Sequence, residues 1–489
     1  MDFVADFETS LLEREKKMTK FIGRTEYLKK LDKLLEKSSS SLVVVTGRRR
    51  IGKSRLIKEF GKNHRLLSFE GIAPHPRTTR QSQLDEFGDQ LGKVTGHPSF
   101  SDKNWNDYFA RLIAYGKEMK EGWMIILLDE ISWMGSKDPA FIAKLKSAWE
   151  KLSENPKIIL ILCGSDSSWI MKNVIQNTAF FGRRDLHLSI KEMPLKEINE
   201  FWGKNHVSAY EKFKIISITG GIPKYLELII PSDTAEENIK RLCFDSSQYL
   251  FKEFNSLFDE QFNKKNILYK SIVKLLVGTS LSYTEVANAL KKESGGTLTS
   301  HLQDLCNSGF LRREPTWSLK TGIESKLSLY RLTDNYLRFY LKYIDPLSSQ
   351  IERGPVNLPN GWDSIMGLQF ENMIINNRQE LFDLLEVKKV VNDGPYFQTK
   401  TRGQEGCQID YLIQTEGCFY VCEVKFSKNP IGMEVVEEMK KKIRALNTSK
   451  DMSLRPVLIH VNGTTRDLEE SDYFTHIIDF SKILNPSGR

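Results

Sequence analysis

The sequence contains few cysteines and none of the long apolar runs that mark a membrane protein. Six of its 489 residues are cysteine, and Cys407, Cys418 and Cys422 lack the C-x2-C spacing of a zinc site. No stretch of about 18 apolar residues occurs, and the charged N-terminal segment lacks the apolar core of a signal peptide. We therefore expect reduced cysteines, a cytoplasmic protein, and neither a disulfide framework nor a membrane span.

Length and charge set the scale of the protein. A chain of 489 residues is long enough for about two to four domains. Its 40% hydrophobic and 27% charged residues are ordinary for a soluble globular protein. The formal net charge of +8 permits a polyanionic partner such as DNA without requiring one.

Short apolar segments alternate with helical patterns in the first half of the chain. The clearest apolar segments are residues 41–47, 123–130 and 157–165, and amphipathic stretches such as FIAKLKSAWEKL separate them. Strands that are apolar throughout are typical of a parallel sheet covered on both faces. The alternation with helices then predicts an α/β fold for this part of the chain.

Changes in pattern divide the chain into five parts. Residues 1–20 form a charged leader, 21–230 hold the α/β core, 231–345 are mostly helical, 346–362 form a linker with prolines and glycines, and 363–489 return to strand–helix alternation. Within the mostly helical part, three short helical patterns precede a pair of strands. That order is typical of a winged helix-turn-helix.

The segment TGRRRIGKS contains the phosphate-binding pattern G-x-x-x-x-G-K-[ST]. Its glycines allow the tight turn whose backbone N–H groups surround phosphate oxygens, its lysine reaches the outer phosphates, and its serine can ligate Mg²⁺. It follows a predicted strand and opens a helix, as this loop requires. The residues expected at a nucleotide are Gly47, Arg48, Arg49, Arg50, Ile51, Gly52, Lys53, Ser54 and Arg55. The alternative is a basic strand-to-helix turn without a ligand.

Two acidic residues end the second apolar strand. Asp129 and Glu130 would lie at the carboxyl edge of the sheet, where ligands bind in such folds. Asp129 is expected to hold the water shell of Mg²⁺, and Glu130 to orient or activate water against the γ-phosphate. Ser165 is a candidate sensor of that phosphate, and Arg183 or Arg184 could act on a neighbouring subunit of a homo-oligomer. A turn serine and a surface arginine pair are the alternatives.

Five segments carry a family resemblance. In this order, FIGR, GRRRIGKS, LLDE, CGS and GGIPKYL resemble the prokaryotic STAND-type ATPases of the AAA+-like class, over residues 21–345. The resemblance implies a P-loop core with ATP bound between it and a helical lid plus winged helix. It further implies that Gly23 and Arg24 lie on the adenine side, and that Gly221 and Pro223 form a lid turn at the nucleotide.

The expected winged helix is strongly basic. From Asn263 to Leu332, 11 Lys and Arg residues stand against 5 Asp and Glu, a net charge of +6. Phosphate contacts would carry most of the affinity for DNA and make binding sensitive to salt. The expected contact residues are Thr297, Ser300, His301 and Gln303 on the recognition helix and Lys320 and Lys326 on the wing. The alternative is a lid whose positive face is solvated.

The stretch QIDYLIQTEGCFYVCEVKF predicts a hairpin that turns at Glu416–Gly417. Pairing Thr415 with Cys418 sets Asp410 opposite Glu423 and Gln408 opposite Lys425, and all four then share one face. Two opposed carboxylates repel, so the pairing predicts Mg²⁺ or Mn²⁺ between them. Lys425 would position a water nucleophile whose pKa the metal lowers. A salt bridge of Lys425 with Asp410 or Glu423 is the alternative.

This D…E-x-K pattern resembles the PD-(D/E)xK nuclease superfamily, over residues 363 to about 480. The resemblance implies a restriction-endonuclease-like fold and a third metal-binding acid from a preceding helix, for which Glu371 is the candidate. An exposed helix glutamate is the alternative, and Ile409 stands where the motif has proline. Candidates for phosphate contacts, or for a solvated face, are Lys440, Lys441, Lys442 and Arg444.

The sequence thus predicts an ATP-dependent switch that controls a metal-dependent DNA nuclease on the same chain, in DNA repair or defence. Glu371, Asp410, Glu423 and Lys425 would act on the phosphodiester, with Mg²⁺ or Mn²⁺ held by the three acids. One alternative is an ATP-switched DNA-binding regulator whose C-terminal domain does not cut. Another is a signalling ATPase that assembles with partners through that domain.

Overall fold

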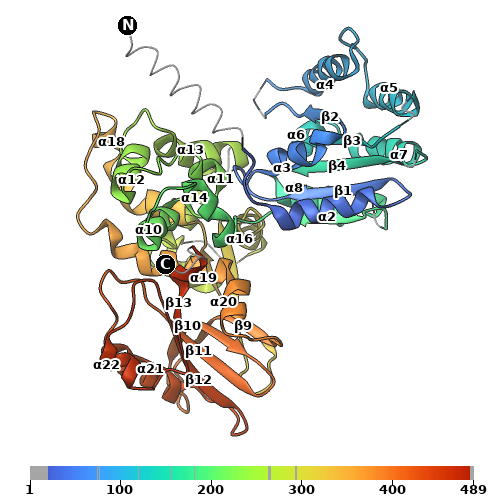
Figure 1. Ribbon diagram of the computed structural model, residues 1–489. Coiled ribbons are helices and arrows are strands. Elements are labelled where there is room, and N and C mark those ends of the chain that lie inside the picture. The colour runs from blue at the N-terminus through green and yellow to red at the C-terminus, as the bar shows by residue number, and fades with distance from the viewer. Residues whose placement is uncertain are drawn as a thin grey trace. The chain divides into compact units, whose positions relative to one another are not determined.

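The computed structural model describes residues 20–73, 75, 77–118, 121–155, 157–180, 182–262, 266–291 and 295–484, which form two compact units (Figure 1). The first unit contains the described residues up to Met193 together with Ile222–Glu227 and 259–262, and the second contains the others. The charged leader, residues 1–19, lies outside the described residues. No helix in the described ranges is long and apolar enough to cross a membrane.

A five-stranded parallel sheet forms the centre of the first unit. Its order is β2-β3-β4-β1-β5. The strands are β1 (Ser41–Thr46), β2 (Arg65–Glu70), β3 (Met124–Asp129), β4 (Ile158–Gly164) and β5 (Leu186–Ser189). β1, β3 and β4 are buried along their whole length, as their apolar sequences predict. All neighbours are parallel, so the carboxyl ends of β1, β3 and β4 meet at one edge.

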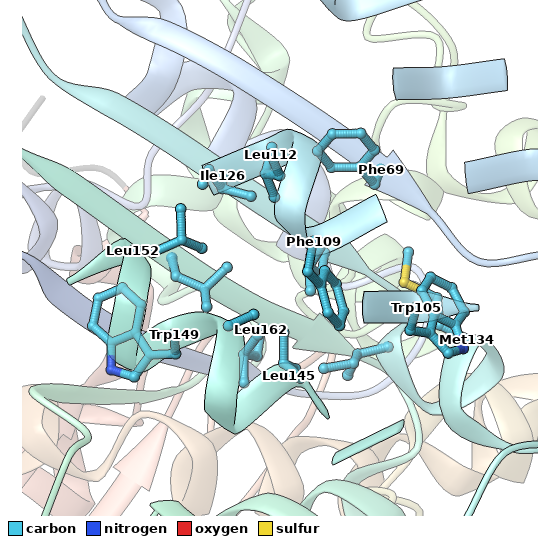
Figure 2. Close-up of a cluster of buried hydrophobic side chains, with 14 of the residues drawn as sticks. Phe69, Trp105, Phe109, Leu112, Ile126, Met134, Leu145, Trp149, Leu152 and Leu162 are labelled. Carbon is cyan, nitrogen blue, oxygen red and sulfur yellow. The ribbon is translucent and has the colours of Figure 1, made fainter. Parts of the chain in front are cut away.

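Helices cover this sheet and fix its strands. They are α2 (Thr25–Leu35), α3 (Lys53–Phe60), α4 (Arg80–Thr95), α5 (Trp105–Glu118), α6 (Ile131–Gly135), α7 (Phe141–Leu152), α8 (Ser167–Ile170) and α11 (Pro223–Leu226). Figure 2 shows Trp105 of α5 and Trp149 of α7 in the buried cluster with Ile126 of β3. Each such side chain stabilises the fold by about 1.5–3 kcal/mol, and the cluster holds the strand that ends in Asp129.

The second unit begins with helices. They are α9 (Leu195–Ile198), α10 (Ala209–Thr219), α12 (Ala235–Cys243), α13 (Tyr249–Phe262), α14 (Asn266–Leu275), α15 (Tyr283–Ala289), α16 (Gly296–Asn307), α17 (Asn335–Phe339) and α18 (Ser348–Ile351). The last four residues of α13, 259–262, belong to the first unit. Strands β6 (Leu281–Ser282), β7 (Leu311–Trp317) and β8 (Glu324–Leu332) form an antiparallel sheet in the order β6-β8-β7. Three helices followed by a strand pair are therefore present where the sequence predicts them.

The segment 346–362, which the sequence predicts as a linker, is packed within the second unit. It contains α18, the backbone N–H of Val356 donates to the carbonyl oxygen of Phe244 at 3.2 Å, and Lys240 donates to Asn357 at 2.7 Å. Trp362 is buried beside Phe339. The helical and C-terminal parts therefore belong to one compact unit.

A mixed five-stranded sheet forms the C-terminal part, in the order β13-β12-β11-β10-β9. Its strands are β9 (Asn392–Gln398), β10 (Cys407–Gln414), β11 (Cys418–Val424), β12 (Ser453–His460) and β13 (His476–Asp479). The helices are α19 (Met366–Asn376), α20 (Arg378–Leu384), α21 (Glu434–Ala445) and α22 (Arg466–Glu470). β9, β10 and β11 are antiparallel neighbours, whereas β11, β12 and β13 are parallel.

The hairpin of β10 and β11 has the register that its turn predicts. Tyr411 pairs with Cys422, and the N–H of Thr415 donates to the carbonyl oxygen of Cys418 at 2.9 Å. Strand β11 is buried on both faces, including the face that carries Glu423. Helix α21 covers the face that carries the acids, and its Met439 packs in the same core as Val421.

Candidate functional sites

The loop between β1 and α3 has the backbone shape of a phosphate cradle. Gly47, Arg50 and Gly52 adopt positive φ angles of 148°, 67° and 88°. At Gly47 a Cβ atom would lie 2.5 Å from the carbonyl oxygen of Ile190, so a larger residue cannot fit without a shift. Gly52 precedes α3, and the first N–H groups of that helix are therefore directed at the loop.

Two buried cations brace this loop. The ammonium of Lys53 donates to the carbonyl oxygens of Gly47 at 2.9 Å and Arg48 at 3.1 Å. The guanidinium of Arg24 donates to the carbonyl oxygens of Ile51 at 2.8 Å and Lys191 at 2.6 Å. Arg24 thus holds the loop from the side of α2, and a contact of Gly23 or Arg24 with adenine stays a prediction.

The strand-end acids lie at the carboxyl edge of the same sheet. Asp129 is buried, and Glu130 has a left-handed backbone with φ of 49°. Such a backbone costs about 1–2 kcal/mol, and strain of this kind clusters at functional sites. The carboxylate of Glu130 accepts hydrogen bonds from the backbone N–H of Ser165 at 3.1 Å and from its hydroxyl at 2.9 Å. Ser165 therefore holds the candidate water-orienting carboxylate.

A third acid at this edge was missed by the sequence interpretation. Glu70 ends β2 and is the Cα partner of Asp129 on β3. Partial burial, followed by the negative charges of Asp129 and Glu130, raises the pKa of Glu70. The signal was available, because RLLSFE ends an apolar strand with an acid as MIILLD does.

The predicted lid turn reaches the phosphate loop. A Cβ on Gly52 would lie 3.7 Å from Cγ of Pro223, and Arg55 pairs with Glu227 just after α11. Arg55 is thus engaged with this segment. Arg183 and Arg184 lie on the surface, where Arg183 pairs with Glu150 at 3.0 Å.

Comparison with known proteins agrees with this geometry. A family model described as an ATPase domain predominantly from Archaea matches residues 21–229. Residues 21–229 therefore form an archaeal-type ATPase domain. The ATPase domain contains the phosphate loop, the acids at the end of β3 and Pro223, so its nucleotide is expected beside these residues.

Relatives extend beyond the ATPase domain. The chain is 26% identical over 377 residues to the uncharacterized protein MJECL04 of Methanocaldococcus jannaschii, across 76% of this chain and 79% of that protein. It resembles the Walker-type ATPase PABY2304 of Pyrococcus abyssi, with a TM-score of 0.51 and 16% identity over 66% of this chain and 96% of that one. The ORC2 protein of Aeropyrum pernix, solved as ADPNP–ADP complexes, has a TM-score of 0.43 and 14% identity over 66% and 91% of the two chains. The Pyrococcus structure supports the P-loop ATPase fold.

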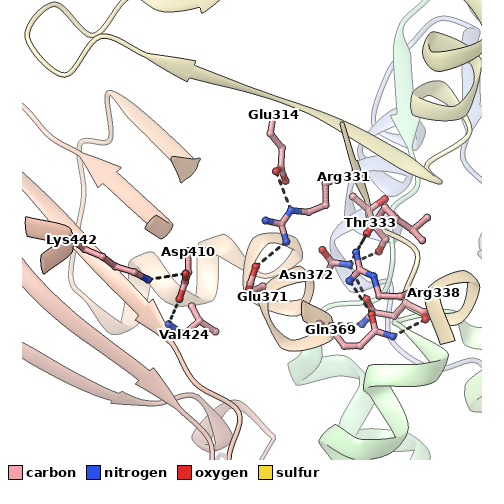
Figure 3. Close-up of polar contacts among 12 residues, drawn as sticks. Glu314, Arg331, Thr333, Arg338, Gln369, Glu371, Asn372, Asp410, Val424 and Lys442 are labelled. Atoms are coloured by element: carbon pink, nitrogen blue, oxygen red, sulfur yellow. Dashed lines mark hydrogen bonds and ion pairs between the residues drawn. The ribbon is translucent and has the colours of Figure 1, made fainter. Parts of the chain in front are cut away.

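Two acids and two lysines meet at the open end of the β10–β11 hairpin. The ammonium of Lys442, from α21, lies 3.2 Å from Oδ1 of Asp410 (Figure 3). It also lies 2.6 Å from Oε2 of Glu423. Oδ2 of Asp410 accepts the N–H of Val424 at 2.9 Å. The ammonium of Lys425 lies 3.1 Å from Oε1 of Glu423 and 2.7 Å from Glu438, whereas Gln408 is exposed. The structure thus brings together three of the predicted site residues.

Burial and charge shift the pKa values within this cluster. Burial, followed by the charge of Asp410, raises the pKa of Glu423, and Lys442 offsets part of that rise. Burial by itself would lower the pKa of Lys442, but the two carboxylates raise it overall. Lys425 behaves in the same way beside Glu438 and Glu423, so its pKa is raised as well. The lysines are therefore charged, and they neutralise an acid pair that would otherwise repel.

Glu371 is neither an exposed helix residue nor part of a complete metal-ligand set. Its carboxylate lies 2.9 Å from the guanidinium of Arg331 on β8, which also binds Glu314 at 3.0 Å (Figure 3). Burial, with a smaller contribution from Asp410, raises the pKa of Glu371, and Arg331 counteracts this. Among the described residues, no three His, Cys, Asp or Glu side chains are arranged to hold a metal ion. Of the three expected metal-binding acids, Asp410 and Glu423 contact the same cation, Lys442, whereas Glu371 pairs with Arg331.

One predicted DNA contact is wrong. His301 is buried and meets the ring of Tyr269 edge-on at 4.9 Å, because it lies on the same side of α16 as Leu298 and Leu305. The other predicted contact residues are exposed, namely Thr297, Ser300, Gln303, Lys320 and Lys326. On α21, Lys441 and Arg444 are exposed and Lys440 pairs with Glu437 at 2.8 Å.

Proposed function

We propose that this chain is an ATP-dependent switch that controls a Mg²⁺-dependent DNA nuclease site in its C-terminal part. The observation that carries the nuclease assignment is the convergence of Asp410 and Glu423, from two strands, on one cationic group beside Lys425. A restriction-endonuclease-like domain of the PD-(D/E)xK type accounts for this arrangement.

The residues present fit a magnesium ion. Mg²⁺ usually binds one or two carboxylates and keeps several waters, so Asp410 and Glu423 suffice without Glu371. The ammonium of Lys442 marks the place where these two carboxylates accept a positive charge. Bound Mg²⁺ or Mn²⁺ would supply a water nucleophile and stabilise charge on a phosphodiester. Lys425, held between Glu423 and Glu438, can bind a phosphate oxygen at the rim of the cluster.

We assign the steps of ATP hydrolysis to residues at the sheet edge. Lys53 would exchange its two carbonyl partners for the outer phosphates, and Ser54 and Asp129 would hold Mg²⁺. Glu130 would orient the attacking water, but its carboxylate is occupied by hydrogen bonds from Ser165. Glu130 would have to leave Ser165 before hydrolysis starts, so the site can hold ATP as a switch.

Helix α10 offers a route from the nucleotide to the nuclease site. The chain passes from the second unit to the first between Gly221 and Ile222, directly after α10 and directly before Pro223. Pro223 lies close to Gly52 of the phosphate loop. A change at the nucleotide can therefore act on the C-terminal end of α10.

The other end of α10 is stacked on the nuclease-like part. Tyr210 stacks on Phe426 with ring centroids 5.2 Å apart, and Phe213 meets Phe370 at 5.6 Å. Phe426 directly follows Lys425, and Phe370 directly precedes Glu371. A movement of α10 would thus shift residues on both sides of the acid cluster.

We assign DNA binding to the segment from α14 to β8 as a winged helix. Thr297, Ser300 and Gln303 lie exposed on α16. Lys326 is exposed on β8, and Lys320 is exposed in the turn between β7 and β8. Contacts from lysines to phosphate would make binding salt-dependent. A homo-oligomer, in which Arg183 or Arg184 acts on a neighbouring nucleotide, stays a prediction.

The ion pairs of Lys442 favour one second candidate, an ATP-switched DNA-binding regulator that does not cut. In that protein the cluster of Asp410, Glu423 and Lys442 would only stabilise the fold. Cleavage of supercoiled plasmid with Mg²⁺ or Mn²⁺, with and without ATP, separates the two. Cleavage that Asp410→Asn abolishes supports the nuclease, and salt-sensitive DNA binding without cleavage supports the regulator.

A further inference from the structure

We infer that Lys442 is an internal cation that holds the divalent-metal position between Asp410 and Glu423, so that a metal must displace its side chain to bind. The inference rests on the proposed metal-dependent function and adds a gate to the same site. It gives Lys442, expected from the sequence to contact phosphate or solvent, a role in controlling when the site is loaded.

The oxygen atoms of the acid pair are divided between two kinds of partner. Oδ2 of Asp410 accepts the backbone N–H of Val424 at 2.9 Å, and Oε1 of Glu423 lies 3.1 Å from Lys425. The remaining oxygen of each acid faces Lys442, at 3.2 Å for Asp410 and 2.6 Å for Glu423. Each carboxylate is therefore anchored through one oxygen and presents the other to a shared cation.

Lys442 is placed by the packing of α21. Val435 and Met439 are fully buried on the inner side of this helix, and Lys442 lies one turn after Met439 on the same side. Its side chain is 23% exposed, compared with 3% for Glu423. Because a lysine ammonium sits on a flexible four-carbon stem, it can leave the carboxylates for solvent while α21 stays in place.

The ammonium of Lys442 and a divalent metal ion cannot occupy the site together, because both are positively charged. An ammonium and a divalent ion within hydrogen-bonding distance of the same oxygens repel strongly in a partly buried site. A metal that enters would move Lys442 outward while its backbone remains anchored on α21. The displaced ammonium could then meet the phosphate of DNA, which would link metal loading to substrate binding.

The first test measures Mn²⁺ binding to the nucleotide-free full chain by electron paramagnetic resonance. Lys442→Met should tighten binding about 10- to 100-fold, the size expected for removing hydrogen bonds between charged groups. Lys441→Met, which removes an exposed charge one residue away, should change it by less than about twofold. Asp410→Asn combined with Glu423→Gln should remove the site.

The second test uses the unsubstituted protein. Acetylation of Lys442 by acetic anhydride, followed by mass spectrometry, should rise several-fold when Mn²⁺ is added, and that of Lys441 should not change. The inference about Lys442 would be overturned if Mn²⁺ bound through Asp410 and Glu423 without increasing the acetylation of Lys442. An unchanged Mn²⁺ affinity in Lys442→Met would overturn it as well, and either result would leave the proposed metal-dependent function standing. If neither the unsubstituted protein nor Lys442→Met binds Mn²⁺ through Asp410 and Glu423, both the inference and the proposed metal-dependent function are wrong.

Discussion

Replacing Arg331 by methionine should destabilise the second unit by about 3–5 kcal/mol. Arg331 is 3% exposed and binds Glu314 at 3.0 Å and Glu371 at 2.9 Å, so its loss leaves two carboxylates without their shared cation. Removing one partner of a buried ion pair typically costs that much. Adding Glu314→Gln and Glu371→Gln should recover most of the loss, because the three charges then disappear together.

The loss of stability caused by Arg331→Met should also depend on pH in a defined direction. Burial already raises the pKa of Glu371 against the pull of Arg331, and without Arg331 the pKa should rise further. A carboxyl whose pKa is raised in the folded state stabilises it when protonated and destabilises it when ionised. The effect of Arg331→Met should therefore be largest above the folded pKa of Glu371 and shrink as the pH falls through it.

Hydrogen exchange measures this loss of stability within the second structural unit itself. Peptides covering β8 and α19, followed in increasing urea, report the opening of the second unit separately from the ATPase domain. Arg313→Met, an exposed arginine on β7 that binds Ser328 at 2.9 Å, should cost less than about 0.5 kcal/mol. A loss below about 1 kcal/mol for Arg331→Met at neutral pH would refute the account of this cluster.

Three further substitutions test the ATPase domain and its coupling. Glu130→Gln should keep ATP binding while slowing hydrolysis about 100-fold or more, measured as phosphate release, and an unchanged rate would remove Glu130 from catalysis. Gly47→Ala should weaken ATP binding at least about tenfold by calorimetry, because its Cβ meets the carbonyl oxygen of Ile190 at 2.5 Å, and normal affinity would contradict the cradle. Tyr210→Ala should leave metal-dependent cleavage intact and abolish its response to ATP, and a retained response would exclude α10 as the route.

Local sequence patterns predicted most of the ATPase domain and the hairpin. Continuous apolar strands and the glycines of the phosphate loop define their own surroundings, so β1, β3, β4 and the turn into α3 follow from nearby residues. The register of β10 and β11 follows from the turn at Glu416–Gly417, because a hairpin's loop fixes its pairing.

The partners of the charged residues could not be predicted in this way. Arg331 and Glu371 are 40 positions apart, and nothing local links them. Lys442 reaches the acids only because α21 covers the charged face of the hairpin. The burial of His301, in contrast, was readable, since Leu298, Leu302 and Leu305 mark the inward side of α16.

Plasmid cleavage by matched variants of the full chain tests the central claim most directly. The account predicts Mg²⁺- or Mn²⁺-dependent cleavage that Glu423→Gln abolishes, and a change in its rate with ATP that Lys53→Ala removes. Glu437→Gln, an exposed acid on α21, should cut as the unsubstituted protein does. Equal cleavage by the protein and Glu423→Gln, or none under any nucleotide and metal condition while DNA is bound, would contradict the nuclease assignment.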